Sequence, residues 1–496
     1  MAKNLTKYIH AGMNKEAGIA HSQKRTKIVA TVGPACDTYE KLLSLVQAGV
    51  NVFRLNFSHG AYEDKLAVIN HIRRIIKEEP YNIAILGDLQ GPKLRVGELE
   101  NGKLILKEGD EFIFTIEKMV GTNQKIYVSY PNLTTDVKAG ERIFLDDGKM
   151  ELSVVKILND KEVLMRVTLG GVLTPKKGVN LPDSVLTMPS MTEKDFADLE
   201  FIIEHKLDWV ALSFVRKAED IINLKKILKA SNSKIKVIAK IEMPEALKNL
   251  RDIIVESDAV MVARGDLGVE IPIEQVPVVQ KDIIRKCMHR AKPVIVATQM
   301  MESMLDRTKP NRSEVSDVAN AVLEGADAVM LSGETATGLY PTLVVETMSK
   351  IIMEVEKTVY DYDRDDILTP QPHSPSFVSD AICYSACKLA KDGQATALVG
   401  MTQSGYTAFM LSSYRPKSPL YIFSKEKTLI GQLSLSWGVR AFYYGEEESL
   451  DDIIFDQIDI LKQRGFVKKD DIVVNTGSTP VHMHLPTNII KITKVE

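Results

Sequence analysis

The sequence predicts an α/β protein: a (β/α)8 TIM barrel with an inserted small β-barrel lid domain and a C-terminal open α/β domain. Three observations predict this fold. Short β-branched runs recur with helical periodicity between most of them. One interval between runs is far too long for a single βα unit. A stretch rich in Asp, Pro and Ser then separates a second set of alternating elements.

The barrel is predicted from eight candidate strands. They are Ile28–Thr31, Val50–Leu55, Ile83–Leu86, Trp209–Leu212, Val237–Lys240, Ala259–Val262, Val294–Ala297 and Ala328–Leu331. Amphipathic segments favour helices at Tyr39–Gln47, Tyr62–Lys77, Glu193–His205, Ala218–Lys229, Pro244–Glu256, Ile283–Arg290 and Arg312–Leu323. Apart from the long interval, strand starts recur about every 20 to 35 residues, the length of one unit in a barrel of roughly 250 residues.

The long interval between Leu86 and Trp209 predicts the inserted domain. Alternating strands at Glu111–Glu117, Arg142–Leu145 and Glu151–Ile157 are separated by glycine-centred turns. A domain inserted after a barrel strand is suited to act as a lid.

We therefore expect an appendage at residues 1–24, a barrel at 25–88 and 175–348, and a lid at 89–174. A C-terminal domain at 349–496 begins with a linker near 361–375 and includes strands at Ala397–Met401, Leu420–Phe423 and Ile472–Thr476.

Composition excludes several classes of protein. The net charge of −3 does not favour nucleic acid or an anionic membrane surface as a partner. The longest apolar run is the five residues Ala259–Ala263, whereas a membrane-spanning helix needs about 20.

The four scattered cysteines, with no apolar leader before Arg25, predict a reduced cytoplasmic protein. Cys383 and Cys387, four apart on an expected helix, are interpreted as core residues.

Polar residues follow the candidate strands, and the carboxyl ends of parallel barrel strands share one rim. Glu242 and Asp266 follow consecutive strands, which lie about 4.8 Å apart in a sheet. Two such carboxylates repel unless a cation lies between them, and oxygen ligands favour Mg²⁺ or Mn²⁺. Lys240, Arg54 and Arg95 would then surround an anion such as phosphate. The alternative is a set of ordinary ion pairs at the barrel rim.

Familiar nucleotide-binding motifs are absent. No two of the 29 glycines are separated by a single residue, which excludes the G-x-G-x-x-G fingerprint. The stretch from Gly97 to Lys103 approaches a P-loop, but Leu104 replaces the required Ser or Thr. Any nucleotide must be bound in another way.

Several long stretches resemble the pyruvate kinase family. They are Lys27–Pro34 (KIVATVGP), Arg54–Gly60 (RLNFSHG), Lys177–Pro182 (KGVNLP), Lys240–Glu242 (KIE), Met261–Pro272 (MVARGDLGVEIP), Ala297–Ser303 (ATQMMES) and Asp327–Thr335 (DAVMLSGET). The resemblance implies the three-domain fold already predicted, a homotetramer, and phosphoryl transfer from phosphoenolpyruvate to ADP, giving pyruvate and ATP.

The resemblance also implies roles for residues. Glu242 and Asp266 would hold the divalent metal, and Lys240 would stabilise the phosphoryl group in flight. The resemblance implies that Arg54 and Arg95 contact the transferring phosphoryl group, and that Thr298 delivers a proton, supported by Ser332 and Glu334. The substrate would be bound by Arg54, Lys240, Gly265, Asp266 and Thr298. The nucleotide would be bound by Asn56, Phe57, Ser58, His59, Arg95 and Lys177.

One position departs from the common pattern of the family. Many members hold K⁺ at the positions matching Asn56, Ser58, Asp88 and the carbonyl of Leu89, and carry Glu where this chain has Lys93. We expect the Lys93 ammonium to replace K⁺, as in the K⁺-independent branch of the family, so that K⁺ is not required. The alternative is a solvated hinge lysine.

A second expectation concerns regulation. The segment 402–407 resembles the family's effector loop, and a phosphorylated effector would contact Thr402, Ser404, Gly405, Tyr406 and Thr407. The alternative is an ordinary turn of small polar residues.

Two rival functions remain at this point. A metal-dependent aldolase or lyase could use the same metal without a nucleotide, and a non-catalytic barrel could serve binding or assembly. The lid, Lys240 and the Arg54/Arg95 pair favour phosphoryl transfer over the aldolase. A non-catalytic role is disfavoured because every expected catalytic position carries a residue able to do its chemistry.

Overall fold

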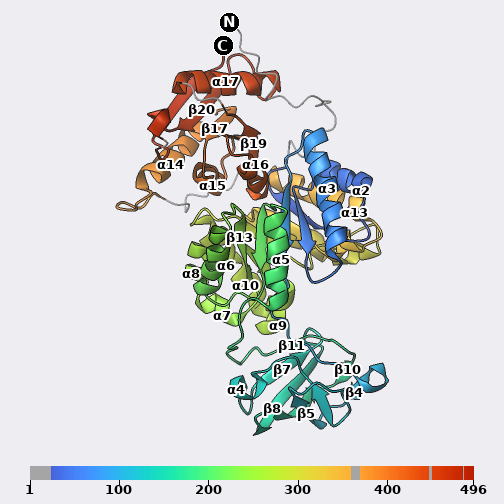
Figure 1. Cartoon of the computed structure of the whole chain (residues 1–496). Helices are drawn as coiled ribbons and strands as arrows, with labels where there is room; N and C mark the ends of the chain where they lie inside the picture. Colours follow the sequence, from blue (N-terminus) through green and yellow to red (C-terminus); the bar gives the residue numbers. More distant parts are fainter. Residues whose placement is uncertain (1–23, 359–368, 446–448, 484) are drawn as a thin grey trace.

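A computed structural model describes residues 24–358, 369–445, 449–483 and 485–496. The described chain forms a central barrel with one domain at each end (Figure 1). The inserted domain extends from the rim where β3 ends, and the C-terminal domain lies against the opposite end. The expected appendage at 1–24 lies outside the described residues except for Lys24, as does the 361–368 part of the expected linker.

The barrel is closed by eight parallel strands, as predicted. Its strands are β1 (Lys27–Thr31), β2 (Val52–Asn56), β3 (Ala84–Asp88), β12 (Trp209–Leu212), β13 (Lys236–Ile241), β14 (Ala259–Ala263), β15 (Val294–Ala297) and β16 (Ala328–Leu331). Strand β3 pairs directly with β12, so the insertion leaves the sheet uninterrupted. Asn56 and Asp88 lie within strands rather than after them, because β2 and β3 run one or two residues further than predicted. Arg54 and Lys240 lie within β2 and β13, inside the predicted strand ranges.

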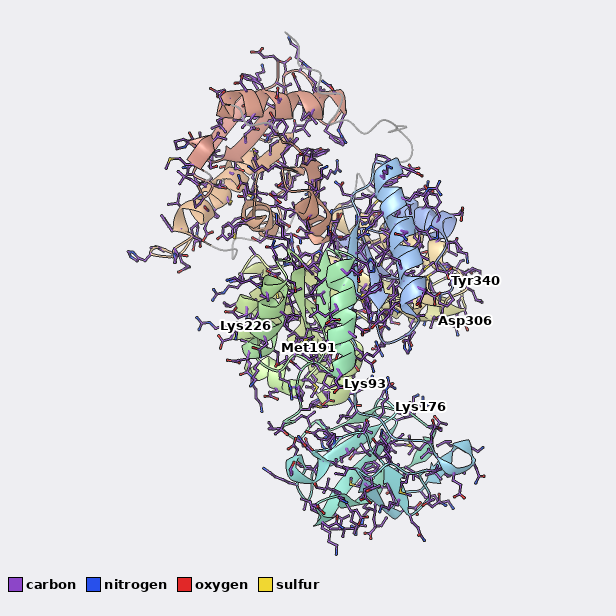
Figure 2. All side chains as sticks on the ribbon, viewed as in Figure 1. Lys93, Lys176, Met191, Lys226, Asp306 and Tyr340 are labelled. Carbon is purple, nitrogen blue, oxygen red and sulfur yellow. The ribbon has the colours of Figure 1, made fainter. Side chains whose placement is uncertain are left out.

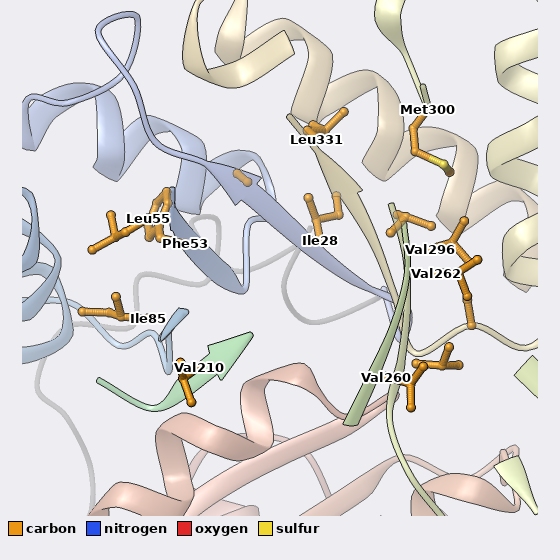
Figure 3. Packing of buried hydrophobic residues seen from close by; sticks show 14 of the residues in the cluster. Ile28, Phe53, Leu55, Ile85, Val210, Val260, Val262, Val296, Met300 and Leu331 are labelled. Atoms are coloured by element: carbon orange, nitrogen blue, oxygen red, sulfur yellow. The ribbon is translucent and has the colours of Figure 1, made fainter. Parts of the chain in front are cut away.

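Alternating side chains divide the strands into two faces. Ile28 and Phe53 point outward to the helices, together with Val210, Val260 and Val296 (Figure 3). Val29 belongs instead to the smaller cluster that fills the barrel interior. This period of two is what a β-strand buried on both faces requires.

The barrel helices follow the predicted segments with three adjustments. They are α2 (Tyr39–Ala48), α3 (Tyr62–Glu78), α5 (Glu193–Glu204), α6 (Ala218–Ala230), α7 (Pro244–Lys248), α8 (Leu250–Glu256), α9 (Arg264–Glu270), α10 (Val276–Met288), α11 (Arg312–Glu324), α12 (Gly333–Ala336) and α13 (Pro341–Glu356). Asn249 splits the segment predicted as one helix into α7 and α8. Helix α10 begins seven residues early because Pro277 is tolerated in a first turn. Helix α13 runs past the expected boundary at 348 and packs against α2 and α11.

The lid contains two sheets. The strands are β4 (Leu104–Leu106), β5 (Glu111–Thr115), β6 (Lys125–Tyr127), β7 (Arg142–Leu145), β8 (Met150–Asn159), β9 (Glu162–Leu169), β10 (Gly171–Leu173) and β11 (Val179–Asn180), with the short helix α4 (Leu133–Asp136). Six strands form one sheet in the order β11-β7-β8-β9-β5-β6. Single bridges from Arg95 to Gly178 and from Val96 to Val128 join the incoming chain to residues beside both edges. These bridges connect the two edges of the sheet through the incoming chain, so the sheet curves into a small barrel that encloses the hydrophobic core of the lid.

The C-terminal domain is an open five-stranded sheet with helices. Its strands are β17 (Ala397–Met401), β18 (Leu420–Ser424), β19 (Val439–Tyr443), β20 (Ile472–Gly477) and β21 (Ile489–Lys494), and its helices are α14 (Phe377–Asp392), α15 (Tyr406–Ser413), α16 (Lys427–Gln432) and α17 (Leu450–Gln463). The order is β19-β18-β17-β20-β21, with β21 antiparallel at the edge. Cys383 and Cys387 lie on α14, where burial raises the pKa of both thiols.

This domain closes the amino end of the barrel. Leu435 belongs to the cluster that fills the barrel interior. The Lys27 ammonium donates to the Val439 carbonyl, and the Trp209 indole donates to the Gln432 carbonyl. Across the described residues, no helix is long and apolar enough to cross a membrane.

Candidate active site

The carboxyl rim of the barrel holds a buried network of charges around Asp88, the last residue of β3. Arg54 Nε donates to Asp88 Oδ2 at 2.6 Å, and Lys240 Nζ lies 3.4 Å from Asp88 Oδ1. Lys240 also contacts Glu242 Oε1 at 2.9 Å. Strands β2, β3 and β13, together with the residue after β13, thus deliver two cations and two carboxylates to one place, although β12 separates β3 from β13 in the sheet.

The pKa shifts of Asp88 and Lys240 each reflect an opposition between burial and neighbouring charges. Burial opposes ionisation of Asp88, yet Lys240 and Arg54 overcome it and hold the pKa of Asp88 below its ordinary value. Burial likewise opposes a charged Lys240, but Asp88 and Glu242 raise its pKa. Lys240 is therefore a permanently charged ammonium at neutral pH.

At Glu242, the net effect of burial and neighbouring charges is to raise the pKa of the carboxyl group. Burial raises the pKa of Glu242, Lys240 lowers it, and repulsion from Asp266 raises it further, so that the net pKa is raised. The Phe214 amide donates to Glu242 Oε2 at 2.6 Å and fixes the carboxylate. The two predicted metal ligands are thus close enough to repel each other, which is the situation that a bound cation relieves.

Gly265, Asp266 and Thr298 meet where β14 and β15 end. Helix α9 begins at Arg264, as the predicted backbone contacts require. The Gly265 amide donates to Thr298 Oγ1 at 2.8 Å, and this hydroxyl donates to the Ala297 carbonyl at 2.6 Å. Thr298 has a φ of +67°, a conformation that costs a β-branched residue free energy and that concentrates at functional sites.

Lys93 lies at the junction of barrel and lid (Figure 2). Its ammonium is 3.2 Å from Asp266 Oδ1 and 4.0 Å from Asp147 Oδ1. Within the described chain, the Lys93 ammonium thus pairs with a predicted metal ligand, Asp266, and with a lid carboxylate, Asp147.

The expected monovalent-cation residues, Asn56, Ser58, Asp88 and Leu89, have hydrogen-bond contacts with residues other than Lys93. Asn56 Oδ1 accepts from the Ser58 amide at 3.0 Å, and the Leu89 carbonyl accepts from Ser213 Oγ at 2.8 Å. Asp88 Oδ1 is buried and, among the described residues, lacks a hydrogen bond.

The predicted nucleotide contacts lie on both the barrel and the lid. Lys177 Nζ pairs with Asp146 Oδ1 at 2.8 Å, and Arg95 donates to the Lys176 carbonyl at 2.9 Å. On the barrel, Ser58 and His59 form the turn after β2, with His59 exposed. The Phe57 side chain is buried in the barrel core, so only its backbone faces the rim.

The segment 402–407 forms the turn between β17 and α15. The Gly405 amide donates to Thr402 Oγ1 at 3.1 Å, and the Tyr406 amide donates to Ser404 Oγ at 3.4 Å. Gly405 has a φ of +90°, which favours glycine. Thr407 Oγ1 lies 2.6 Å from Thr487 Oγ1.

Sequence reasoning missed two residues of the site. Ser213 Oγ accepts from Lys240 Nζ at 2.7 Å while donating to the Leu89 carbonyl. Thr31 Oγ1 accepts from Arg54 at 3.0 Å. Thr31 ends β1 and Ser213 follows β12, so the rule applied to the other strands would have found both.

The donor set suits a hard divalent cation. Among residues that the structure describes, no group of three or more His, Cys, Asp or Glu side chains is arranged to hold a metal. Mg²⁺ is commonly held by one or two carboxylates and completed by water and substrate phosphates. Glu242 and Asp266, which repel each other, meet that requirement.

A closed barrel with a lid, a buried ammonium and a carboxylate pair on the same rim define an enzyme of phosphoryl-transfer chemistry. The model of the pyruvate kinase barrel domain matches residues 23–345, and that of the pyruvate kinase alpha/beta domain matches residues 380–493. The chain belongs to the pyruvate kinase family of glycolytic phosphotransferases.

Similar proteins agree with this assignment. The chain is 42% identical to a pyruvate kinase of Geobacillus stearothermophilus over 95% of its own length and 80% of that protein. It is 40% identical to a pyruvate kinase of Clostridium perfringens over 95% and 100% of the two chains. A crystal structure of a pyruvate kinase from Cryptosporidium parvum superposes with a TM-score of 0.89 at 33% identity, covering 98% of this chain and 100% of that one.

Proposed function

We propose that this enzyme transfers the phosphoryl group of phosphoenolpyruvate to ADP, giving pyruvate and ATP, with Mg²⁺ or Mn²⁺ held by Glu242 and Asp266. The observation that carries the proposal is the buried Lys240 ammonium, held between Asp88 and Glu242 at the barrel rim. An ammonium fixed in a low-dielectric site stabilises negative charge on a transferring phosphoryl group without reorganising.

Each side chain has a defined task in this reaction. Arg54, oriented by Asp88 and Thr31, supplies a second fixed positive charge for the equatorial oxygens. Arg95 and Lys177 approach from the lid side and would bind the nucleotide phosphates, together with the turn at 56–59. When bound, the divalent ion would neutralise charge on substrate oxygens.

Thr298 is placed to deliver a proton to the carbon of the enolate that phosphoryl transfer leaves. Its hydroxyl is held between the Gly265 amide and the Ala297 carbonyl. The Gly265 and Asp266 segment at the start of α9 would bind the substrate carboxylate. Glu334, which accepts from the amides of Ser332 and Met301, fixes the neighbouring loop.

We further propose that Lys93 makes the enzyme independent of K⁺. The hinge lysine brings a tethered positive charge beside Asp266, while Asn56, Ser58, Asp88 and the Leu89 carbonyl offer the oxygen acceptors of a monovalent-cation site. A tethered ammonium beside Asp266, at the same end of the barrel, supplies part of the electrostatic role of K⁺.

The C-terminal domain is proposed to bind a phosphorylated effector through the 402–407 turn. Support comes from its hydroxyls and its left-handed Gly405 at the start of α15. A cytoplasmic homotetramer is the assembly that the family resemblance favours for such regulation.

The decisive experiment is a lactate dehydrogenase-coupled assay with phosphoenolpyruvate, ADP and Mg²⁺. The native protein is expected to form pyruvate. Lys240→Met should be slower by several thousandfold, the effect of losing about 5 kcal/mol of transition-state stabilisation. Lys226→Met, which removes an exposed lysine of α6, is the matched control and should keep full activity.

The assay also separates the rival function. An aldolase or lyase would act on a keto acid without ADP and would tolerate the loss of Lys240. No pyruvate formation by the native protein would refute the proposed reaction.

A further inference from the structure

A buried hydrogen bond ties the lid to the helix that carries Asp266. Asn180 ends the lid strand β11, and Glu270 ends helix α9. Asn180 Nδ2 donates to Glu270 Oε1 at 2.7 Å. The two residues are only 7% and 6% exposed, so their polar atoms must be satisfied within the protein.

Each partner nevertheless keeps one unsatisfied atom. Asn180 Oδ1 and Glu270 Oε2 are both buried and have no hydrogen-bond partner among the described residues. Both atoms are acceptors if Glu270 is ionised, so neither could satisfy the other. A neutral carboxylic acid changes this, because its O–H can donate to an amide carbonyl while its other oxygen accepts from the amide N–H.

The surroundings favour the neutral acid. Both residues line a largely apolar cavity between lid and barrel, with Leu94, Met188 and Met243. The pKa of Glu270 is raised to about 7: burial is the largest cause, the hydrogen bond from Asn180 opposes it, and the charges of Asp266, Asp183 and Glu242 add to the rise.

The cations that line this cavity have other partners. Lys93 pairs with Asp266, and Arg216 donates to the carbonyls of Leu186 and Met188. No ion pair with Glu270 is therefore available from these two side chains to hold its negative charge in the cavity.

We propose that Glu270 is a neutral acid that forms a two-hydrogen-bond pair with Asn180, and that this pair positions the lid on the Asp266 helix for the reaction. This inference rests on the proposed function. Lys93, Arg95 and Lys177 all belong to the hinge and the lid, so the position of the lid sets where their charges fall relative to the rim. Glu270 acts through these residues and does not itself touch substrate.

Conservative and disruptive variants test the pair. Glu270→Gln can form the same two hydrogen bonds through its amide, so it should keep the wild-type kcat/KM. Glu270→Ala and Asn180→Ala should each lower kcat/KM by about 10²-fold, the cost of misplacing catalytic groups by about 1 Å. The double variant should lose no more than either single variant, because the two residues act as a unit.

A second measurement does not depend on turnover. Hydrogen exchange of the lid strands β4–β11, residues 104–180, should be faster in both alanine variants and unchanged in Glu270→Gln. Infrared difference spectra of wild type minus Glu270→Gln, recorded at pH 6 so that a group with a pKa of about 7 is mostly protonated, should show the carbonyl stretch of a protonated acid. A Glu270→Gln variant as impaired as Glu270→Ala, or a carboxylate band in place of the acid band, would overturn the proposal. Failure of the wild type to form pyruvate would instead refute the proposed function and leave these structural readouts intact.

Discussion

The ion pair between Arg415 and Asp327 joins the C-terminal domain to the barrel and offers a quantitative test of what holds the two together. Arg415 donates to Asp327 Oδ1 at 3.1 Å and Oδ2 at 2.9 Å, and to the Gly325 carbonyl at 2.7 Å. The side chains are 4% and 5% exposed. Asp327 also accepts from the amides of Val294 and Trp437.

Replacing Arg415 by Met keeps an unbranched chain but leaves the Asp327 carboxylate buried without its cation. Breaking a buried pair in this way costs about 3–5 kcal/mol, whereas an exposed pair contributes about 0–1 kcal/mol. The double variant Arg415→Met with Asp327→Asn removes both charges. It should therefore lose about 0.5–3 kcal/mol less than the sum of the single variants.

Urea unfolding followed by tryptophan fluorescence measures this directly. The only two tryptophans both lie at this interface: Trp437 under the Arg415 guanidinium and Trp209 bonded to the Gln432 carbonyl. Arg415→Lys, which keeps the charge but loses the planar fork, should fall between wild type and Arg415→Met. If Arg415→Met lowered the free energy of unfolding by less than about 1 kcal/mol, the reasoning would be refuted, because the Arg415–Asp327 pair would then contribute no more than an exposed ion pair.

Three further predictions concern cations, pH and effectors. Activity in Na⁺ or Tris buffers should match that in K⁺, and a large saturable rise on adding K⁺ would contradict the role of Lys93. Asp208, whose pKa burial raises from 3.8 to about 7, binds a proton more tightly folded than unfolded, so stability should fall as pH rises from about 4 to about 7. Asp208→Asn should remove that dependence and raise the free energy of unfolding at pH 8 by at least ~1 kcal/mol. Fructose 1,6-bisphosphate, ribose 5-phosphate, glucose 6-phosphate or AMP should shift the substrate saturation curve, and indifference to all four would count against an effector site at 402–407.

Much of the fold could be predicted because its signals are local. Every barrel strand contains a short run of apolar residues, and each strand falls within two residues of its prediction at either end. Two strands of the C-terminal sheet, β19 and β21, were not predicted from the sequence. Strand β21 alternates exposed and half-buried residues at a sheet edge, which gives little hydrophobic signal.

The charged rim was predictable for a related reason. Parallel strands of a barrel all end on one face, so reading the residues at strand ends collects Arg54, Asp88, Lys240, Glu242 and Asp266 without any knowledge of distances. The sequence alone therefore determined the barrel, the inserted lid, and the residue types that meet at the rim.

Only the tertiary structure decided which of these charges pair. It placed Asp88 between Arg54 and Lys240, brought Lys93 to Asp266, and joined Asn180 to Glu270 across 90 residues of chain. The physical reason is that ion pairing and burial depend on distances of a few ångströms between residues remote in sequence, whereas strand and helix periodicity is set by neighbours along the chain.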